Sequence, residues 1–146
     1  MSKVELKKAS IDDLPFAEKL LGSNGLPYQD ISSKIDCLFV GYSGSRNVGI
    51  GGVEVYGDYG LLRSLVIDVS SRGKGYGRAL SLKLIEYAKQ VGIRDLYLLT
   101  ITADSFFEKI GFERIHRDEA PEIIRKTSEF SKLCPSSSIC MKMRIP

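Results

Sequence analysis

The amino-acid sequence predicts an α+β fold (mixed α/β) in which helices flank a central mixed β-sheet. Runs of β-branched and aromatic residues separated by tight-turn sequences predict an antiparallel meander in the amino-terminal half of the chain. After Gly75 the apolar residues change to helical spacing, and residues 96–99 form a continuous apolar run typical of a buried strand. Such a strand pairs in parallel with an earlier one across the intervening helix. We therefore expect the meander to join a β-α-β unit.

The first elements are a short strand and a capped helix. Ser10 offers a helix N-cap with the Asp13 carboxylate three residues on, and Gly22 is placed to end the helix. Tight turns at residues 43–47 and 57–60 then separate the meander strands. The expected elements of this half are a strand at residues 4–6, a helix at 11–21, a loop at 25–30, a helical turn at 31–35, and strands at 37–42, 48–56 and 61–69.

The second half begins with the longest amphipathic pattern of the chain. Apolar residues recur at helical spacing from Leu80 to Val91, and Gly92 ends the pattern. The elements expected after this helix are a strand at residues 96–99, a helix at 103–110, a strand at 112–116, a helix after Pro121, a loop at 134–138 and a last strand at 139–145. No repeat or linker interrupts them, so we expect a single domain over residues 1–146.

Composition narrows the classes of function. The chain has 21 basic and 18 acidic residues, and a net charge of +3 is too mild to argue for nucleic-acid binding but suits an anionic small molecule. A single histidine, His116, argues against a metal site and against a nucleophile pair that needs an imidazole. The sequence shows no secretory pattern and no apolar run near the roughly 20 residues that cross a bilayer. We expect a cytoplasmic protein with no nucleic-acid, membrane or metal partner.

The most informative motif is Arg72-Gly73-Lys74-Gly75-Tyr76-Gly77, between the end of a strand and the start of the longest helix. Glycines permit positive φ, so backbone N–H groups can turn toward an oxyanion while the helix N-terminus adds positive partial charge. Arg72, Lys74 and Arg78 increase the positive potential. The alternative is a flexible, solvated turn, but its place between strand and helix favours phosphate binding.

The spacing of the glycines decides between kinds of phosphate site. Arg78 stands where a dinucleotide fingerprint needs a third glycine, and no Lys-Ser/Thr pair follows Gly77 as in a nucleotide P-loop. The remaining pattern, R-x-x-G-x-G, resembles the pyrophosphate loop of the GNAT superfamily of acyl-CoA-dependent N-acetyltransferases. Residues 65–68 resemble the strand before that loop, and residues 107–112 resemble a later helix-to-strand segment.

A narrower resemblance is to the GNAT proteins associated with arsenic resistance, which are related to amino-acid N-acetyltransferases. It rests on residues 26–27, 49–54, 61–65, 98–103, 129–130 and 133–135. The resemblance implies the GNAT fold and a small acceptor that carries an amine and is expected to carry a carboxylate: an amino acid, or an arsenic- or phosphorus-containing analogue. Because members of the family often dimerise, a homodimer also stays open.

The resemblance implies acetyl-CoA as co-substrate, with no metal. In the family, cofactor amides pair with the backbone of the strand before the phosphate loop. The residues expected at the acetyl-CoA site are Leu65, Val66, Ile67, Arg72, Gly73, Lys74, Gly75, Tyr76, Gly77, Arg78, Thr100 and Ser105. One position departs from the family: Phe107 stands where a tyrosine often protonates the leaving thiolate. The remaining sources of that proton are water, Ser105, Thr102 or a hydroxyl of residues 136–138.

Two charged residues within apolar strands are the catalytic candidates. Glu54 is the first choice as the base that deprotonates the acceptor, and a carboxylate on a solvated strand face is an equal alternative. The planar fork of Arg63 suits an acceptor carboxylate or an arsenate-like oxyanion. The alternatives are that Arg63 reaches water at a strand end or forms a structural ion pair with Glu54 or Asp58. Residues 28–30 either line the acceptor pocket or form an exposed turn. Cys134 is expected to be an inert, partly apolar side chain.

These observations predict direct acetyl transfer from acetyl-CoA to an amine in a ternary complex. A protein amino group is the second acceptor to consider. A non-catalytic module that senses acyl-CoA is a further alternative, because Phe107 has no proton to give.

Overall fold

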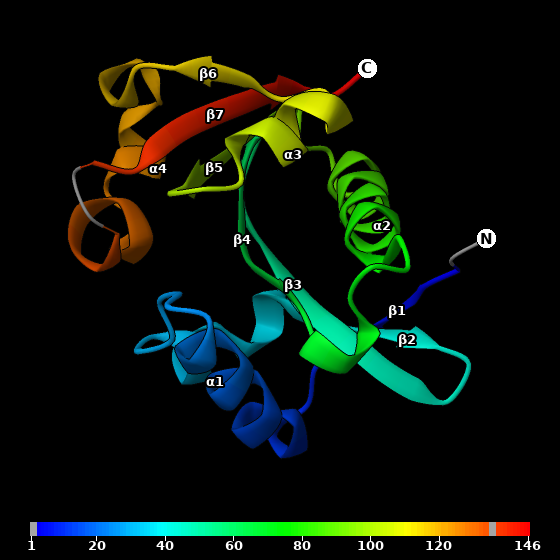
Figure 1. Ribbon diagram of the computed structural model, residues 1–146. Helices are drawn as coiled ribbons and strands as arrows, with labels where there is room; N and C mark the ends of the chain where they lie inside the picture. The colour runs from blue at the N-terminus through cyan, green and yellow to red at the C-terminus, as the bar shows by residue number, and fades with distance from the viewer. Residues whose placement is uncertain (1–2, 135–136) are drawn as a thin grey trace.

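The computed structural model, which describes residues 3–134 and 137–146, has one seven-stranded sheet with helices on both faces (Figure 1). The strand order is β1-β2-β3-β4-β5-β7-β6. Neighbouring strands are antiparallel except for β4 and β5, which are parallel and are joined through helix α2. The predicted α+β class is therefore confirmed, with its meander, its β-α-β unit and its mixed sheet.

Nearly every segment predicted from the sequence has a counterpart among the observed elements. The strands are β1 Glu5–Lys8, β2 Leu38–Ser43, β3 Arg46–Tyr56, β4 Tyr59–Ile67, β5 Asp95–Thr100, β6 Glu113–Ile115 and β7 Ile139–Arg144. The α-helices are α1 Leu14–Ser23, α2 Tyr76–Gln90, α3 Asp104–Ile110 and α4 Glu122–Arg125. The 3-10 turns are η1 Ile11–Asp13, η2 Ile31–Cys37, η3 Val69–Ser71 and η4 Arg117–Glu119, and η5 Glu129–Leu133 is a π-helix.

Two predicted segments have different bounds in the structure, and the π-helix was not predicted. The predicted helix at residues 11–21 is divided into η1 and α1, with a proline in the first turn of α1, and α1 continues past Gly22 to Ser23. The predicted strand at 61–69 is β4 shifted toward the amino terminus, and Val69 instead begins η3. The π-helix η5 has no counterpart among the predictions, because its sequence carries no signal that separates it from a loop. Residues 135–136 of the predicted loop lie outside the described residues.

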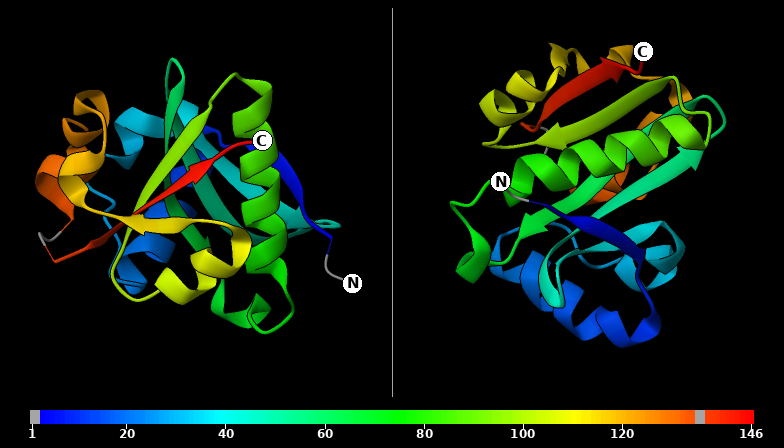
Figure 2. Two further views of the ribbon diagram at one scale, coloured as in Figure 1. Left: turned by 90° about the horizontal axis from the view of Figure 1, so that it is seen from above. Right: turned by 90° about the vertical axis from the view of Figure 1, so that its right-hand side faces the viewer.

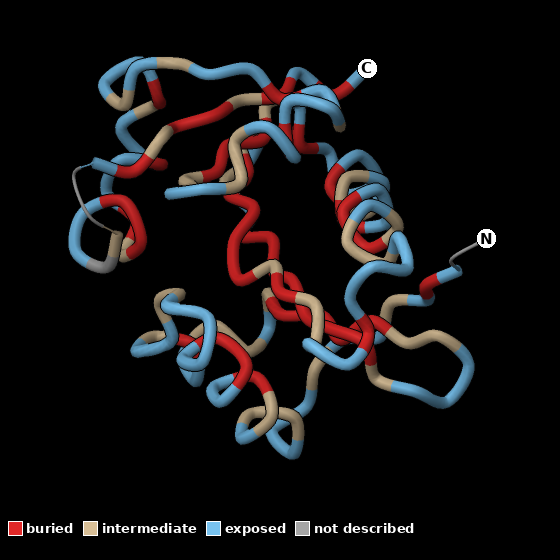
Figure 3. The backbone as a smooth tube through the Cα atoms, viewed as in Figure 1, coloured by how far each residue is buried: buried red, intermediate tan, exposed pale blue. Residues whose placement is uncertain are grey.

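Helices pack on both faces of the sheet and divide the core into layers. Leu80, Leu84 and Ala88 of α2 are fully buried against one face, in the same apolar cluster as Leu62 of β4. On the opposite face, α1 packs over Val66, whereas α4 and η5 pack over Leu61. Figure 2 shows the helices around the sheet in two further views, and Figure 3 shows the buried backbone of the central strands. One face of β4 is therefore covered by two separate groups of helices, with Arg63 between them in sequence.

The central strands β4 and β5 are paired at one end and separate beyond it. They pair only over Tyr59–Leu61 and Asp95–Tyr97 in the described part of the chain. Just beyond, the pairing of β3 with β4 shifts, so that Ser64 and Leu65 occupy the space opposite Gly51. Ser64 has φ of 61°, a backbone conformation that residues other than glycine rarely adopt. Beyond Leu61, β4 has no pairing with β5 among the described residues, so the last part of β4 is free on that side.

Candidate active site

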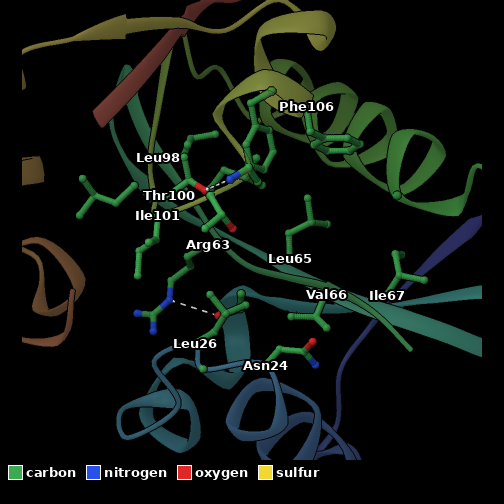
Figure 4. Close-up of a pocket in the computed structure, with 18 of the residues that line it drawn as sticks. Asn24, Leu26, Arg63, Leu65, Val66, Ile67, Leu98, Thr100, Ile101 and Phe106 are labelled. Carbon is green, nitrogen blue, oxygen red and sulfur yellow. Dashed lines mark hydrogen bonds between the residues drawn. The ribbon is translucent and has the colours of Figure 1, made fainter. Parts of the chain in front are cut away.

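A cavity of about 590 Å³ lies where β4 and β5 separate (Figure 4). Its walls are residues 62–67 of β4 and residues 98–103, which run from β5 toward α3. One end is closed by residues 24–27 after α1 and by residues around the start of α2. The cavity therefore connects the predicted phosphate loop to the middle of the sheet.

The predicted loop has the backbone conformation that its glycines were expected to permit. Gly73 has φ of 78° and Gly75 has φ of 81°, both left-handed, and Gly75 is the N-cap of α2. The first turn of α2 carries no acidic side chain. Its leading N–H groups have no acceptor within the helix, so this end of the cavity offers donors and positive partial charge to an anion.

Arg72 fixes the loop to its surroundings. Its Nε donates to the Ile67 carbonyl at 3.0 Å, and its Nη2 donates to Oδ1 of Asn24 at 2.6 Å. The guanidinium thus ties the loop to the end of β4 and to the residue after α1. The neighbouring Ser71 is fully buried and lines the cavity, and its Oγ has no hydrogen-bond partner among the described residues. Sequence reasoning missed Ser71, because a serine at a turn carries no such signal.

Most residues predicted for acetyl-CoA border the cavity. Thr100 is one of them, and its Oγ1 accepts a hydrogen bond from the Ala103 N–H at 3.0 Å, which closes the turn before α3. The predicted residues that line the cavity are Arg63, Leu65, Val66, Ile67, Arg72, Gly73, Gly75, Tyr76, Gly77 and Thr100. The predicted residues that do not line it are Glu54, Lys74, Arg78 and Ser105. The last three are exposed, so their proposed roles rest on the sequence alone.

Arg63 is the centre of a buried ionic cluster at the other end of the cavity. Its Nη1 and Nη2 donate to the two carboxylate oxygens of Asp30 at 2.7 and 2.6 Å, and Nη1 also donates to Oε2 of Glu54 at 2.8 Å. The alternative of an ion pair between Arg63 and Glu54 is therefore present in the structure. The third carboxylate, that of Glu129, lies 3.7 Å from Nε.

Glu54 is enclosed by its partners. It is 2% exposed, so the alternative of a solvated strand carboxylate is wrong. The Tyr56 hydroxyl donates to its Oε1, and the Lys34 ammonium lies 3.7 Å from the same oxygen. Burial and the hydrogen bond to Glu54 raise the pKa of Tyr56, so that phenol stays protonated. Glu54 contacts Arg63, which borders the cavity, but Glu54 itself does not border it.

Glu129 does border the cavity, and sequence reasoning gave it no catalytic role. It begins η5, is 4% exposed, and its Oε2 has no hydrogen-bond partner among the described residues. Burial raises the pKa of Glu129 to about 8; Arg63 opposes this rise, and Glu54 and Asp30 add to it. The residue appeared among the motifs of the narrower resemblance, but only the fold brings it to Arg63.

The groups proposed to protonate a leaving thiolate differ in whether they line the cavity. Thr102 lines the cavity, and Ser105 does not. Ser136 lies outside the described residues. Phe107 is buried at the cavity wall, with its ring between those of Phe106 and Phe112.

The Cys134 thiol also lines the cavity. Burial, with the nearby Glu129 carboxylate, raises the pKa of Cys134 to about 12, so the side chain is a thiol at neutral pH. This agrees with its expected inert character. Within residues 3–134 and 137–146, no group of His, Cys, Asp and Glu side chains is arranged to hold a metal ion, and no helix is long and apolar enough to cross a membrane.

Comparison with known proteins identifies the family. The model of the acetyltransferase (GNAT) domain matches residues 34–114 of the 146, more than half of the chain. The chain belongs to the GNAT acetyltransferase family. Within this GNAT domain the match runs from η2 through the phosphate loop to β6, and so includes both strands that wall the cavity.

Relatives of this GNAT domain include an amino-acid acetyltransferase of Neisseria meningitidis, which is 32% identical over 69 residues. That alignment covers 47% of this chain and only 16% of the relative. A structure of N-acetylglutamate synthase from Neisseria gonorrhoeae, complexed with coenzyme A and N-acetyl-glutamate, matches with a TM-score of 0.84 at 21% identity. The match covers 100% of this chain and 36% of the synthase.

A structure of similar size is the ribosomal-protein-S18-alanine N-acetyltransferase of Escherichia coli. It matches with a TM-score of 0.75 at 19% identity, over 97% of this chain and 94% of that one. At these identities the likenesses between structures establish the GNAT fold of this chain.

Proposed function

We propose that this domain is an acetyl-CoA-dependent N-acetyltransferase that moves an acetyl group directly to the amine of a small acceptor. The proposed acceptor carries a carboxylate, as an amino acid or an arsenic- or phosphorus-containing analogue does. The observation that carries this proposal is a single cavity that joins a glycine-lined helix N-terminus to a buried ionic cluster. Similarity to the Neisseria amino-acid acetyltransferase supports the same class of acceptor.

The loop end of the cavity fits the diphosphate of coenzyme A. The left-handed Gly73 and Gly75 let the backbone approach closely, and the Ser71 hydroxyl offers a polar contact that the protein itself does not use. The free side of β4 along Leu65, Val66 and Ile67 offers backbone groups to the amides of the cofactor arm. Bound acetyl-CoA would supply the acetyl thioester.

The protein's part in the transfer is to position the acceptor and to remove its proton. Holding both reactants in one cavity lowers the entropic barrier, and a carboxylate near the amine generates the free nucleophile. Ser64 and Leu65 of the β4 bulge line the cavity, and in this proposal a backbone N–H there polarises the thioester carbonyl. Arg63 also lines the cavity, and an acceptor carboxylate would compete with Asp30 for its fork.

The test has two parts. Titration calorimetry with coenzyme A measures binding, and thiol release from acetyl-CoA measures transfer to a panel of amines. The panel contains amino acids, phosphorus- and arsenic-containing analogues, their decarboxylated counterparts and a short peptide with a free amino terminus. We expect binding and amine-dependent thiol release, fastest with a carboxylate-bearing acceptor. Absence of binding would end the assignment, and a preference for the peptide would favour protein amino groups.

A non-catalytic acyl-CoA-binding module is the second candidate. Phe107 favours it, because a phenyl ring at the cavity wall cannot protonate a thiolate. Coenzyme A binding without thiol release for any amine would identify this module. A single domain over residues 1–146, a cytoplasmic location, a homodimer and a link to arsenic resistance also stay predictions from the sequence.

A further inference from the structure

The ionic cluster at the inner end of the cavity has more carboxyl groups than cations in contact with them. Three carboxylates, of Asp30, Glu54 and Glu129, surround the single guanidinium of Arg63. Lys34 approaches only the Glu54 side of the cluster, at 3.7 Å, and is 31% exposed. Buried carboxylates need hydrogen bonds or cations to replace the water that they lose. On the side that meets the cavity, Glu129 has the 3.7 Å contact with Arg63 and the charge of Arg117.

Arg63 has little to offer Glu129. The guanidinium fork is engaged with Asp30 and Glu54, and Nε donates to the Ser64 hydroxyl at 3.3 Å. Glu129 Oε1 has only an ion-pair contact with Nε, at 3.7 Å, and Oε2 lacks any hydrogen-bond partner in the described chain. Both carboxylate oxygens of Glu54 accept hydrogen bonds, whereas Glu129, which borders the cavity, has an oxygen without one among the described residues.

We propose that Glu129 is the catalytic base of this domain, and that its Oε2 binds the acceptor's ammonium group and removes a proton from it. This assignment rests on the proposed function. One N–H bond of the ammonium breaks and one O–H bond forms on Glu129, which leaves a neutral amine. The amine forms the new C–N bond as the C–S bond breaks, and its second proton leaves with the thiolate sulfur. Glu129 then returns its proton to solvent.

The charges around Glu129 fit this role. Arg63 favours the carboxylate, whereas Glu54 and Asp30 disfavour it; Arg117 approaches from η4 and also favours the carboxylate. The Cys134 side chain lies close by as a neutral thiol. Burial is the largest influence, and the resulting pKa of about 8 lets the carboxyl both accept and release a proton near neutral pH.

Arg63, Asp30 and Glu54 then act as positioning residues. The fork holds two carboxylates in fixed places, and Tyr56 fixes the far oxygen of Glu54. This frame keeps Glu129 beside the cavity without satisfying its second oxygen. Glu54, the base suggested by the sequence, is the direct competitor in the test.

The experiment compares Glu129→Gln with Glu54→Gln. We expect Glu129→Gln to lower kcat/KM at least about 100-fold, as loss of a general base does, and to abolish the acidic limb of the pH profile near pH 8. Glu54→Gln should keep that limb. Because neither variant changes the phosphate loop, calorimetry should give wild-type affinity for coenzyme A. Glu129→Asp keeps a carboxyl group, so it should keep the acidic limb at a lower rate. This variant keeps the assignment testable if Glu129→Gln folds poorly.

A second readout needs no turnover. Carbon-13 NMR of labelled glutamate should show one carboxyl that titrates near pH 8 in the free wild-type protein and is missing in Glu129→Gln. The assignment is overturned if Glu129→Gln retains the acidic limb, or if Glu54→Gln is the variant that loses it. Wild-type protein that releases no thiol with any amine would instead overturn the proposed function together with this assignment.

Discussion

Both terminal nitrogens of Arg63 donate to the carboxylate of Asp30, at 2.7 and 2.6 Å, across 33 residues of sequence. This two-point contact joins the loop after α1 to the middle of β4. Bidentate contacts of this kind are strong and fix orientation as well as distance. Asp30 therefore determines what else Arg63 can bind, and two predictions follow from the pair.

The first prediction concerns stability. Arg63→Ala leaves three buried carboxylates without their shared cation, so it should lower the free energy of unfolding by about 3–5 kcal/mol. Urea denaturation measures the loss. Arg114→Ala is a matched control, because Arg114 pairs with two acidic residues but is 53% exposed, and its loss should cost under about 1 kcal/mol. Equal losses in the two variants would contradict the account of the cluster.

The second prediction concerns the acceptor. Asp30→Asn removes a charge that competes with an acceptor carboxylate for the Arg63 fork. If Arg63 binds that carboxylate, the KM for an amino acid should fall several-fold relative to the KM for its decarboxylated amine. Steady-state thiol release with the two acceptors measures the ratio. An unchanged ratio would remove Arg63 from acceptor binding and leave it a structural residue.

The third prediction concerns the loop. Gly75 has φ of 81° as the N-cap of α2, a conformation that a β-branched side chain disfavours strongly. Gly75→Val should therefore weaken coenzyme A binding at least about 10-fold, a change of roughly 1.4 kcal/mol. Calorimetry checks it. Gly44→Val is the control: Gly44 has φ of 64° at the β2–β3 turn with open space around it, so similar strain there should leave the affinity unchanged.

The fourth prediction concerns the unused hydroxyl of Ser71. Because Ser71 Oγ makes no hydrogen bond within the described chain, Ser71→Ala should leave the stability of the free protein unchanged or slightly higher. The same change should weaken coenzyme A binding several-fold. Ser81→Ala is the control, because the Ser81 hydroxyl donates to the Gly77 carbonyl at 2.7 Å. Its loss should lower the stability of the free protein without removing a direct contact to the ligand. Thermal unfolding with and without coenzyme A separates the two effects.

The fifth prediction concerns pH and stability. Because the pKa of Glu129 rises from 4.5 in the unfolded chain to about 8 in the fold, the folded protein binds more protons between these values. Its stabilising contribution is complete below about pH 4.5 and is lost as pH rises to about 8. Glu129→Gln removes this dependence, so its melting temperature should exceed that of wild type by several degrees at pH 9 and by less at pH 6. A constant difference would argue against the raised pKa.

Local patterns in the sequence were sufficient for the fold and for the phosphate end of the cavity. The glycines at 73 and 75, followed by the apolar spacing of α2, act over a few residues, so a reader of the sequence can see both the turn and the helix. The same is true of the alternation that predicts the meander strands. These elements depend on their own residues more than on distant contacts.

At the inner end of the cavity the sequence suggested the pair of Arg63 and Glu54, but not the contacts of Arg63 with Asp30 and Glu129. The partners of Arg63 come from three other segments: Asp30 precedes η2, Glu54 is in β3 and Glu129 is in η5. No local spacing links Asp30 or Glu129 to Arg63 in the sequence. Glu129 in particular follows a short helix and begins a π-helix, where nothing local marks it as buried. Its role depends on which partners the fold leaves it, and that is a property of packing.

The left-handed Ser64 gives β4 one residue more than β3 at the cavity. That single insertion resets the alternation of the strand, since side chains beyond it point to the opposite sides from those that an unbroken count would give. Removing Ser64 would shorten the chain by one residue and place Leu65 alone opposite Gly51, so Val66 would still face α1 and Ile67 would still face α2. The extra residue therefore changes the path of β4 at the cavity wall and leaves the apolar side chains beyond it on the faces that a regular strand of the remaining residues would give them.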